Sequence, residues 1–419
     1  MPPSHRIGFV STRLAGTDGV SLETAKWARV LTEMGHECFF FAGELDWPSE
    51  RSYHLPEAHF QHPEIQAINA DLFDDYRRSS KTSGEVHHLR YYIKEHLHAF
   101  IEKFDLELLI TENALSIPMN VPLGLALTEL IAETCMPTVG HHHDFFWERK
   151  RFGVSGANDY LRAAFPPTLP SIHHVVINSF AARQLALRTG VTSTVIPNVM
   201  DFDHPPDPPD AYSADLRAVL GLRPEERFIL QPTRVVPRKR IEHAIEIVRR
   251  LGIPARLVIT HSAGDEGTAY FRYLQEYARL LNTPMLFAAE HFNHVRQRTP
   301  DGRKIYALAD AYQHADLVTY PSTVEGFGNA FLESIYYKRP LVMSTYEIFR
   351  TDIQPKGFQV VGFDDFITDE TVEQARRILE DPALAEEITA RNYELGRRHY
   401  SFRALEKHLT ALMHTCLGA

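Results

Sequence analysis

The stretch LVTYPSTVEGFGNAFLESIYYKRPLVM, Leu317 to Met343, decides the fold. It starts with an apolar run, passes through a glycine-containing turn, and continues into a helical pattern that leads to a second apolar run. This order predicts a strand, a turn, a helix and another strand, which is the repeating unit of a parallel sheet. Two carboxylates, Glu325 and Glu333, stand eight positions apart around the turn. The stretch therefore poses a question of function as well.

The same alternation of strand and helix patterns runs along the whole chain. It begins at RIGFVSTR, Arg6 to Arg13, and restarts after the proline-rich DFDHPPDPPDAY, where a regular helix or central strand is excluded. A chain of 419 residues exceeds what one hydrophobic core usually serves. We therefore expect an N-terminal domain over residues 1–204, a linker over 205–212, a C-terminal domain over 213–398, and a final helix over 399–419.

This alternation predicts an α/β fold with two Rossmann-like, doubly wound domains that face each other across a cleft. The amphipathic final helix needs an apolar surface to cover. In doubly wound sheets, ligands bind beyond the carboxyl ends of the strands. Motifs that directly follow predicted strands are therefore the candidate site residues.

Composition excludes several classes of protein. With 44% apolar and 23% charged residues the chain is of the globular type, and no window resembles a membrane-spanning helix or a secretion signal. A net charge of −10 without a dense basic run argues against nucleic acid and anionic membranes as partners. Widely spaced cysteines favour reduced thiols, so we expect a cytoplasmic protein; they are Cys38, Cys135 and Cys416.

The turn EGFGNAFLE has the features of an anion site. Asn329 is a suitable N-cap, which predicts a helix from Ala330, and Gly326 and Gly328 let a ligand approach the backbone. The positive end of a helix suits a phosphate, and the two carboxylates suit sugar hydroxyls on either side. The alternative interpretation is an ordinary glycine-rich turn followed by a helix with surface glutamates.

A second motif, QPTRVVPRKR, follows another predicted strand. Arg234 and Lys239 stand five positions apart in it. Two cations beside a helix start would neutralise a diphosphate leaving group, whose charge grows in the transition state. An isolated pair of this kind can also be a solvated basic turn.

Together the two motifs resemble those of the retaining nucleotide-sugar glycosyltransferases of the family-4 type, which have the GT-B fold. The matching elements are Arg234 to Lys239 and Glu325 to Glu333, and the family usually has a glycine after the lysine where this chain has Arg240. The resemblance extends over the whole chain in motif order, through a glycine loop at Gly16 to Gly19, a strand end at His141 to Asp144, and IPNVMDF before the linker.

The resemblance implies that the C-terminal domain binds the nucleotide sugar and that the N-terminal domain lies on the acceptor side. It also implies roles for the donor-side residues. Glu333 would bind the ribose hydroxyls, Glu325 the hydroxyls of the donor sugar, and Arg234 with Lys239 the diphosphate. Further donor contacts would come from the backbone at Phe327, Gly328 and Asn329 and from the loop at Gly16 and Gly19. The final helix would cross back to the N-terminal domain.

The stretch VGHHHDFFWERKRF offers two interpretations. Three histidines and an aspartate suggest a zinc site, but alternation along a strand prevents His141, His142 and His143 from all converging on one ion. The resemblance instead implies that His143 and Asp144 face the donor sugar and acceptor. The following residues suit a polyhydroxyl or carboxylate-bearing acceptor, or simply a packed loop; they are Trp147, Glu148, Arg149 and Arg151.

We therefore expect a hexosyltransferase that uses a nucleotide-diphosphate sugar, GDP-mannose or UDP-glucose, as donor and a small polar acceptor, with no metal and no cofactor required. HHHDFFWER and TYEIFRTDIQPKGF resemble the mannosylglucosylglycerate synthase-like subgroup, which implies a glucosylglycerate-like acceptor. THSAGDEG, Thr260 to Gly267, is a further candidate donor contact. The alternatives are a nucleotide-sugar 2-epimerase and a catalytically silent binding protein, and an oligomer is left open. Signatures of dinucleotide-binding, P-loop and α/β-hydrolase proteins are absent.

Overall fold

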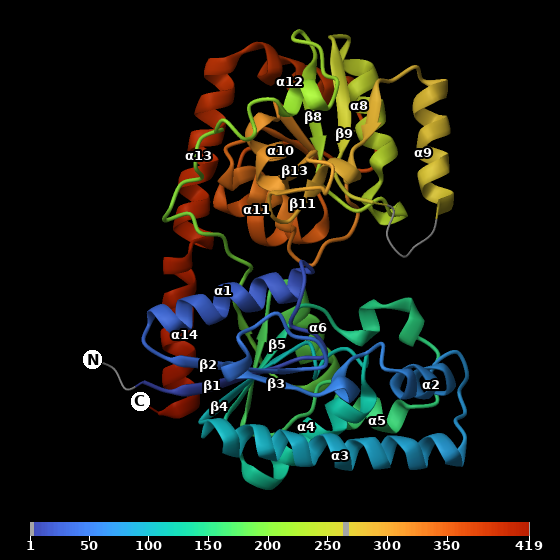
Figure 1. Cartoon of the computed structure of the whole chain (residues 1–419), viewed down its shortest axis with the longest axis vertical. Coiled ribbons are helices and arrows are strands. Elements are labelled where there is room, and N and C mark those ends of the chain that lie inside the picture. Colours follow the sequence, from blue (N-terminus) through green and yellow to red (C-terminus); the bar gives the residue numbers. More distant parts are fainter. Residues whose placement is uncertain (1–3, 263–267, 419) are drawn as a thin grey trace. The chain divides into compact units, whose positions relative to one another are not determined.

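The computed structural model describes residues 4–262 and 268–418. The chain forms two compact units: unit 1 comprises residues 1–199 and 402–419, and unit 2 comprises residues 200–401. Figure 1 labels their helices and strands. Among the described residues, none of the helices has the length and apolar character that crossing a bilayer demands.

Unit 1 is built around one parallel sheet. Its elements are β1 (Arg6–Val10), α1 (Gly19–Glu33), β2 (Glu37–Ala42), β3 (Ser52–His54), α2 (Pro63–Leu72), α3 (Ser80–Phe104), β4 (Leu108–Glu112), α4 (Val121–Thr134), β5 (Thr138–His142), α5 (Asn158–Ala164), β6 (Ile172–Val176), α6 (Ser179–Thr189), β7 (Thr194–Val195) and α14 (Phe402–Leu417). The strand order is β3-β2-β1-β4-β5-β6-β7. Every residue of β4 and β5 is buried, as expected for central strands covered on both faces.

The last helix of the chain belongs to the core of unit 1. Leu405, Leu409 and Leu412 of α14 pack in one apolar cluster with Trp27 and Leu31 of α1. The spacing of these leucines is that of a helix with one buried face. The final helix thus begins at Phe402, three residues after the expected start, because Ser401 separates it from the preceding helix.

Unit 2 contains a second parallel sheet. Its elements are α7 (Leu216–Val219), β8 (Arg227–Gln231), α8 (Ile241–Leu251), β9 (Ala255–Ile259), α9 (Thr268–Leu280), β10 (Met285–Phe287), β11 (Phe292–Asn293), β12 (Gln297–Arg298), β13 (Lys304–Ala307), α10 (Leu308–His314), β14 (Leu317–Tyr320), α11 (Asn329–Tyr336), β15 (Leu341–Ser344), β16 (Val361–Phe363), α12 (Asp369–Glu380) and α13 (Pro382–Tyr400). The order of the larger sheet is β10-β9-β8-β14-β15-β16, and β11-β13-β12 form a small separate sheet.

The stretch 317–343 folds as predicted, into β14, α11 and the parallel neighbour β15. The predicted start of its helix was wrong by one residue. Gly328, with φ of 112°, is the N-cap, and Asn329 is the first helical residue. A left-handed backbone there favours glycine over asparagine as the residue that turns the chain into the helix.

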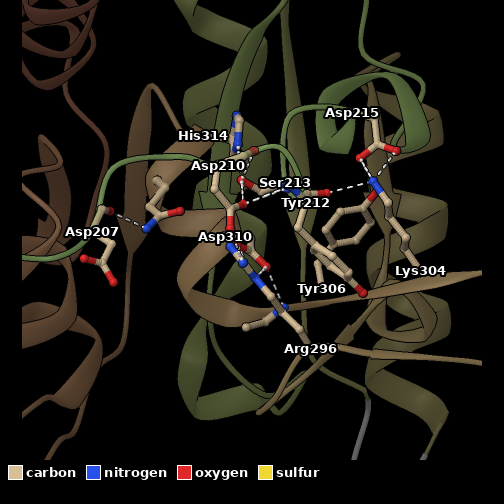
Figure 2. Close-up of polar contacts among 12 residues, drawn as sticks. Asp207, Asp210, Tyr212, Ser213, Asp215, Arg296, Lys304, Tyr306, Asp310 and His314 are labelled. Carbon is tan, nitrogen blue, oxygen red and sulfur yellow. Dashed lines mark hydrogen bonds and ion pairs between the residues drawn. The ribbon is translucent and has the colours of Figure 1, made fainter.

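The proline-rich segment over residues 205–212 lies inside unit 2 and is fastened to it by polar contacts (Figure 2). The carbonyl of Asp207 accepts a hydrogen bond from Gln313, with an N–O distance of 2.7 Å. Arg296 forms ion pairs with both Asp210 and the fully buried Asp310, at 2.5 Å each. Prolines prevent regular structure in this segment, so these side-chain contacts hold it in place.

Candidate active site

The carboxyl ends of β8 and β14 bring the two motifs of unit 2 together. These strands are parallel neighbours in the sheet, so the loops that follow them leave on the same edge. The backbone N–H of Thr323 donates to the carbonyl of Arg238, with an N–O distance of 3.1 Å, and links the two loops. Lys239 and Glu325 form an ion pair within this arrangement.

Lys239 lies at the centre of the site. It is 8% exposed, its ammonium lies 5.2 Å from the centre of the Tyr320 ring, and Arg238 approaches the same Glu325 carboxylate at 3.7 Å. Burial lowers the pKa of Lys239, and the charges of Arg238 and Arg234 act in the same direction, against the raising effect of Glu325. More positive charge is thus gathered here than one carboxylate balances.

Arg234 extends this positive region, and the neutral side chain of His261 lies beside it. Arg234 is exposed, and among the described residues it forms no ion pair. His261 follows β9, and burial together with Arg234 and Lys239 lowers its pKa to about 4, which keeps the imidazole neutral near pH 7. The sequence indicated His261 only as part of the segment Thr260 to Gly267, of which residues 263–267 lie outside the described part.

Arg240, directly after the lysine, adopts a left-handed backbone with φ of 45°. This conformation suits glycine and is costly for other residues. The position is therefore one where a glycine, as the related family has, would fit the backbone. The side chain of Arg240 reaches the carbonyl of Asp365 at 3.3 Å, which helps to hold the loop.

The glycine turn before α11 is tightly enclosed. A Cβ at Gly328 would lie 2.3 Å from the hydroxyl of Tyr346, and that hydroxyl donates a 2.7 Å hydrogen bond to the carbonyl of Phe327. The ring of Phe327 is 3% exposed and packs against Tyr400, with ring centres 5.2 Å apart. The ring of Phe327 is therefore part of the core of unit 2 and is not available to a ligand.

Glu333 lies just over one turn into α11 and is half-buried. Tyr312 donates a hydrogen bond to its Oε2, with an O–O distance of 2.7 Å. Tyr312 itself is fully buried, so its hydroxyl fixes the direction in which the carboxylate points. Lys239, Glu325 and Glu333 thus come from elements that follow neighbouring strands of one sheet, and the sequence placed both motifs after strands. The role expected for each stays a prediction.

In unit 1, a buried carboxylate joins two of the three histidines. Glu112 ends β4 and pairs with His141 of β5 in the sheet register. Its carboxylate lies 3.0 Å from Nδ1 of His141 and 2.9 Å from Nε2 of His143. Burial favours a raised pKa for Glu112, but the charges and hydrogen bonds of both histidines outweigh it and lower the pKa to about 2.

The two histidines respond differently to the same carboxylate. Burial lowers the pKa of His143, but its bond to Glu112 prevails and the pKa is raised. For His141, which is fully buried and stacked on Trp27 at 4.1 Å between ring centres, burial prevails and the pKa is lowered. Glu112 therefore favours the protonated form of His143, whereas burial favours the neutral form of His141.

Strand alternation separates the third histidine from this group, as predicted. His142 points to the other side and its Nε2 lies 2.9 Å from Nδ1 of His174. Glu112, His141 and His143 each offer one atom that could bind a metal ion, and these three atoms lie within 4.8 Å of one another. Both imidazoles already bond the carboxylate directly, which satisfies it without an ion. The expectation of no metal stays a prediction.

A polar chain continues from His143 toward the loop after β5. The backbone N–H of His143 donates to Oδ1 of Asn113 at 2.8 Å, and Nδ2 of Asn113 donates to Asp144 at 3.1 Å. Arg149 then binds the second oxygen of Asp144 through Nε at 2.6 Å. His143, Asp144 and Arg149 are thus held as one group at the strand end.

The first loop of unit 1 follows β1. Gly16 has a left-handed backbone, with φ of 74°, and its N–H donates to Asp46 at 2.7 Å. Gly19 is the first residue of α1, whose N-cap is Asp18. The loop follows the carboxyl end of β1, as the sequence predicted. Its contact with a diphosphate stays a prediction.

Sequence reasoning missed Glu112. An acidic residue at the end of the apolar run LLITE was a usable signal, because a charge there must find a partner at the same sheet edge. Its partners lie about 30 residues further along the chain, so no local motif could indicate the pairing.

Residues 213–395 match the family model described as Glycosyl transferases group 1. The fold is shared with solved glycosyltransferases of the GT-B type. The sucrose-phosphate synthase of Thermosynechococcus elongatus matches with a TM-score of 0.66 at 16% identity, over 99% of each chain. The Anabaena protein Alr3699/HepE, solved with UDP-glucose, matches with a TM-score of 0.66 at 12% identity, over 98% of this chain and 100% of that one.

The chain belongs to the group 1 glycosyltransferases, of the family-4 type with the GT-B fold. Within this class it is similar to two mannosylglucosylglycerate synthases. That of Thermotoga maritima is 33% identical over 96% of this chain and 98% of its own, and that of Petrotoga mobilis is 31% identical over 85% and 86%. The predicted family and subgroup are thereby confirmed.

Proposed function

We propose that this glycosyltransferase moves a hexose, with retention of configuration, from GDP-mannose or UDP-glucose to a small soluble hydroxyl acceptor of the glucosylglycerate type. The observation that carries the proposal is the positive region around Lys239 beside the Glu325 carboxylate at the strand ends of unit 2. The similar mannosylglucosylglycerate synthases support the acceptor class. The Anabaena structure with UDP-glucose supports a nucleotide sugar as donor.

The roles follow from the chemistry of each group. Arg234 and Lys239 neutralise the diphosphate, and because its charge grows as the glycosidic bond breaks, they stabilise the transition state more than the bound donor. Glu325 and Glu333 accept hydrogen bonds from hydroxyls of the donor sugar and of the ribose. Each charge-assisted hydrogen bond of this kind contributes roughly 1.5–3 kcal/mol.

Retention needs no nucleophile from the protein in this mechanism. The acceptor hydroxyl attacks the anomeric carbon on the face that the diphosphate leaves, and a leaving phosphate oxygen accepts the hydroxyl proton. His143, whose protonated form is favoured by Glu112, donates a hydrogen bond to a sugar hydroxyl. Lys239 and Arg234 supply the positive charge that a metal ion would otherwise provide, so we expect no metal or cofactor to be required.

The test begins with a thermal-shift panel of nucleotide sugars, followed by measurement of nucleotide release with and without glucosylglycerate. We expect stabilisation by one donor and release that depends on the acceptor. Release without any acceptor would indicate a nucleotide-sugar 2-epimerase instead. Stabilisation without release under any condition would indicate a binding protein. Lys239→Ala serves as the control that removes the diphosphate contact.

A further inference from the structure

The loop between β5 and α5 of unit 1 carries two arginines whose charge the proposed roles leave unused. Arg149 and Arg151 lie two positions apart in this loop, beyond the strand end that holds His143. Both carry a planar guanidinium, the group best suited to bind a carboxylate through two parallel hydrogen bonds. Their surroundings differ in a way that indicates what they bind.

Arg149 has a fixed position. Its Nε and Nη2 both bind Oδ2 of Asp144, at 2.6 and 2.5 Å. Asp144 is in turn oriented by Asn113, which also accepts the N–H of His143. The side chain of Arg149 remains 39% exposed, and it holds Asp144 through Nε and Nη2. Arg149 can therefore present part of its guanidinium to a ligand without releasing Asp144.

Arg151 has no carboxylate partner among the described residues. Its guanidinium lies 4.5 Å from the centre of the Phe152 ring, and the polar contact of Nη2 is with the thioether sulfur of Met119, a weak acceptor. Burial lowers the pKa of Arg151, and the charge of Arg149 lowers it further, against a raising effect of Asp144. Of the two arginines only Arg149 is thus paired with a carboxylate, and among the described residues the charge of Arg151 is not balanced by a direct ion pair.

We propose that Arg149 and Arg151 bind the carboxylate of the acceptor, and that Arg151 is the residue that makes the enzyme select a glycosylated hydroxy acid over its neutral analogue. This inference rests on the proposed function and names a contact for its acceptor. An acceptor carboxylate that binds both guanidinium groups balances the positive charge of Arg151. The chain from Arg149 through Asp144 and Asn113 then sets the acceptor in register with His143.

The test compares two acceptors that differ in this group: glucosylglycerate, which carries the carboxylate, and glucosylglycerol, which has a hydroxymethyl group instead. kcat/KM is measured for both with the wild type, Arg151→Gln and Arg151→Lys. Lys150→Ala is the matched control, because it removes a neighbouring exposed cation from the same loop. Melting curves verify that each variant is folded.

We expect the wild type to prefer glucosylglycerate. Arg151→Gln loses roughly 10–100-fold in kcat/KM on glucosylglycerate, mostly through KM, and less than about twofold on glucosylglycerol, because one charge-assisted contact is removed. Arg151→Lys keeps the charge without the planar pair of donors and falls between the two. Lys150→Ala keeps the wild-type ratio.

Equal losses of Arg151→Gln on both acceptors, or no loss on either, would overturn the inference. So would a wild type that transfers to both acceptors equally well. In each of these cases nucleotide release still depends on an acceptor, so the proposed function stands. Failure of every donor and acceptor pair to release nucleotide would instead overturn the proposed function and the inference with it.

Discussion

The two units differ in how the charge of a carboxylate is balanced at the ends of their strands. In unit 1 the carboxylate of Glu112 is fully buried and bonded by two histidines, so its charge is balanced within the unit. In unit 2 the carboxylate of Glu325 is bonded by Lys239, while Arg238 and Arg234 add positive charge nearby. A balanced group fixes the local structure, whereas an unbalanced one is prepared for a charged ligand.

The largest expected effect tests the structural side of this comparison. Glu112→Gln removes the negative charge that raises the pKa of His143 and replaces one of the two acceptor oxygens by an NH2 group, so only one imidazole can keep its acceptor. We expect a loss of about 3–5 kcal/mol in the free energy of unfolding, measured in urea at pH 7. Glu33→Gln, which breaks an exposed ion pair with Arg29, is the control and should cost less than about 1 kcal/mol. Similar losses for both variants would contradict a structural role for Glu112.

The pH dependence of that loss follows from the same carboxylate. The pKa of Glu112 is lowered from 4.5 to about 2, so its contribution to stability is complete above pH 4.5 and is lost as the pH falls toward 2. The pKa of His143 is raised, so its contribution is present below pH 6.5 and is lost as the pH rises through the raised value. The stability gap between wild type and Glu112→Gln should therefore be widest between pH 4.5 and 6.5. Urea unfolding at a series of pH values measures it, and a constant gap would contradict the pairing.

A third prediction concerns the turn that shapes the site of unit 2. Gly328→Ala places a Cβ 2.3 Å from the Tyr346 hydroxyl at a backbone φ of 112°. We expect a loss of about 2–3 kcal/mol in stability, from the strained backbone and the collision together. Adding Tyr346→Phe removes the colliding atom, so the double variant should recover part of the loss relative to Tyr346→Phe alone. Strictly additive losses would show that the hydroxyl is not the obstacle.

The smallest of the four expected effects is a loss of turnover when Lys239 is replaced. Lys239→Ala should lower the turnover number by roughly 10–100-fold, because one charge-assisted contact with the leaving diphosphate is lost. Arg249→Ala is the control for removing an arbitrary cation of unit 2 away from the strand ends. Nucleotide release at saturating donor measures both. Near-normal turnover in folded Lys239→Ala would contradict the role proposed for the lysine.

The sequence was sufficient for most of the fold because its signals were local. Alternating strand and helix patterns predicted two parallel sheets, and the glycine turn at Gly326 to Gly328 predicted where β14 gives way to a helix. The helix start at Asn329 was missed by one residue, since asparagine is the better N-cap by propensity but only Gly328 suits the left-handed backbone. Residues 205–212 look like a free linker in sequence, yet they are fastened through Asp210 to Arg296, a contact 86 positions away.

The difference between local signals and contacts of distant residues also explains how much of the site the sequence could predict. Lys239 and Glu325 belong to motifs that each follow a predicted strand, so their place at strand ends was predictable, but the ion pair between them, 86 positions apart, was not. Glu112 and His261 belong to no such motif, and their importance depends on what the fold brings beside them. Charge balance around a buried group is a property of the folded chain, and the spacing of residues along the sequence does not reveal it.

The central claim is that a hexose is transferred to the acceptor with retention of its configuration. Its most direct test is the NMR spectrum of the product formed from GDP-mannose and glucosylglycerate, or from UDP-glucose and glucosylglycerate if UDP-glucose is the donor found to bind. Both donors carry the hexose in the α configuration. We predict a new glycosidic bond to the acceptor whose anomeric proton and carbon show the α configuration. A β-linked product, or released free hexose with no new bond, would contradict it.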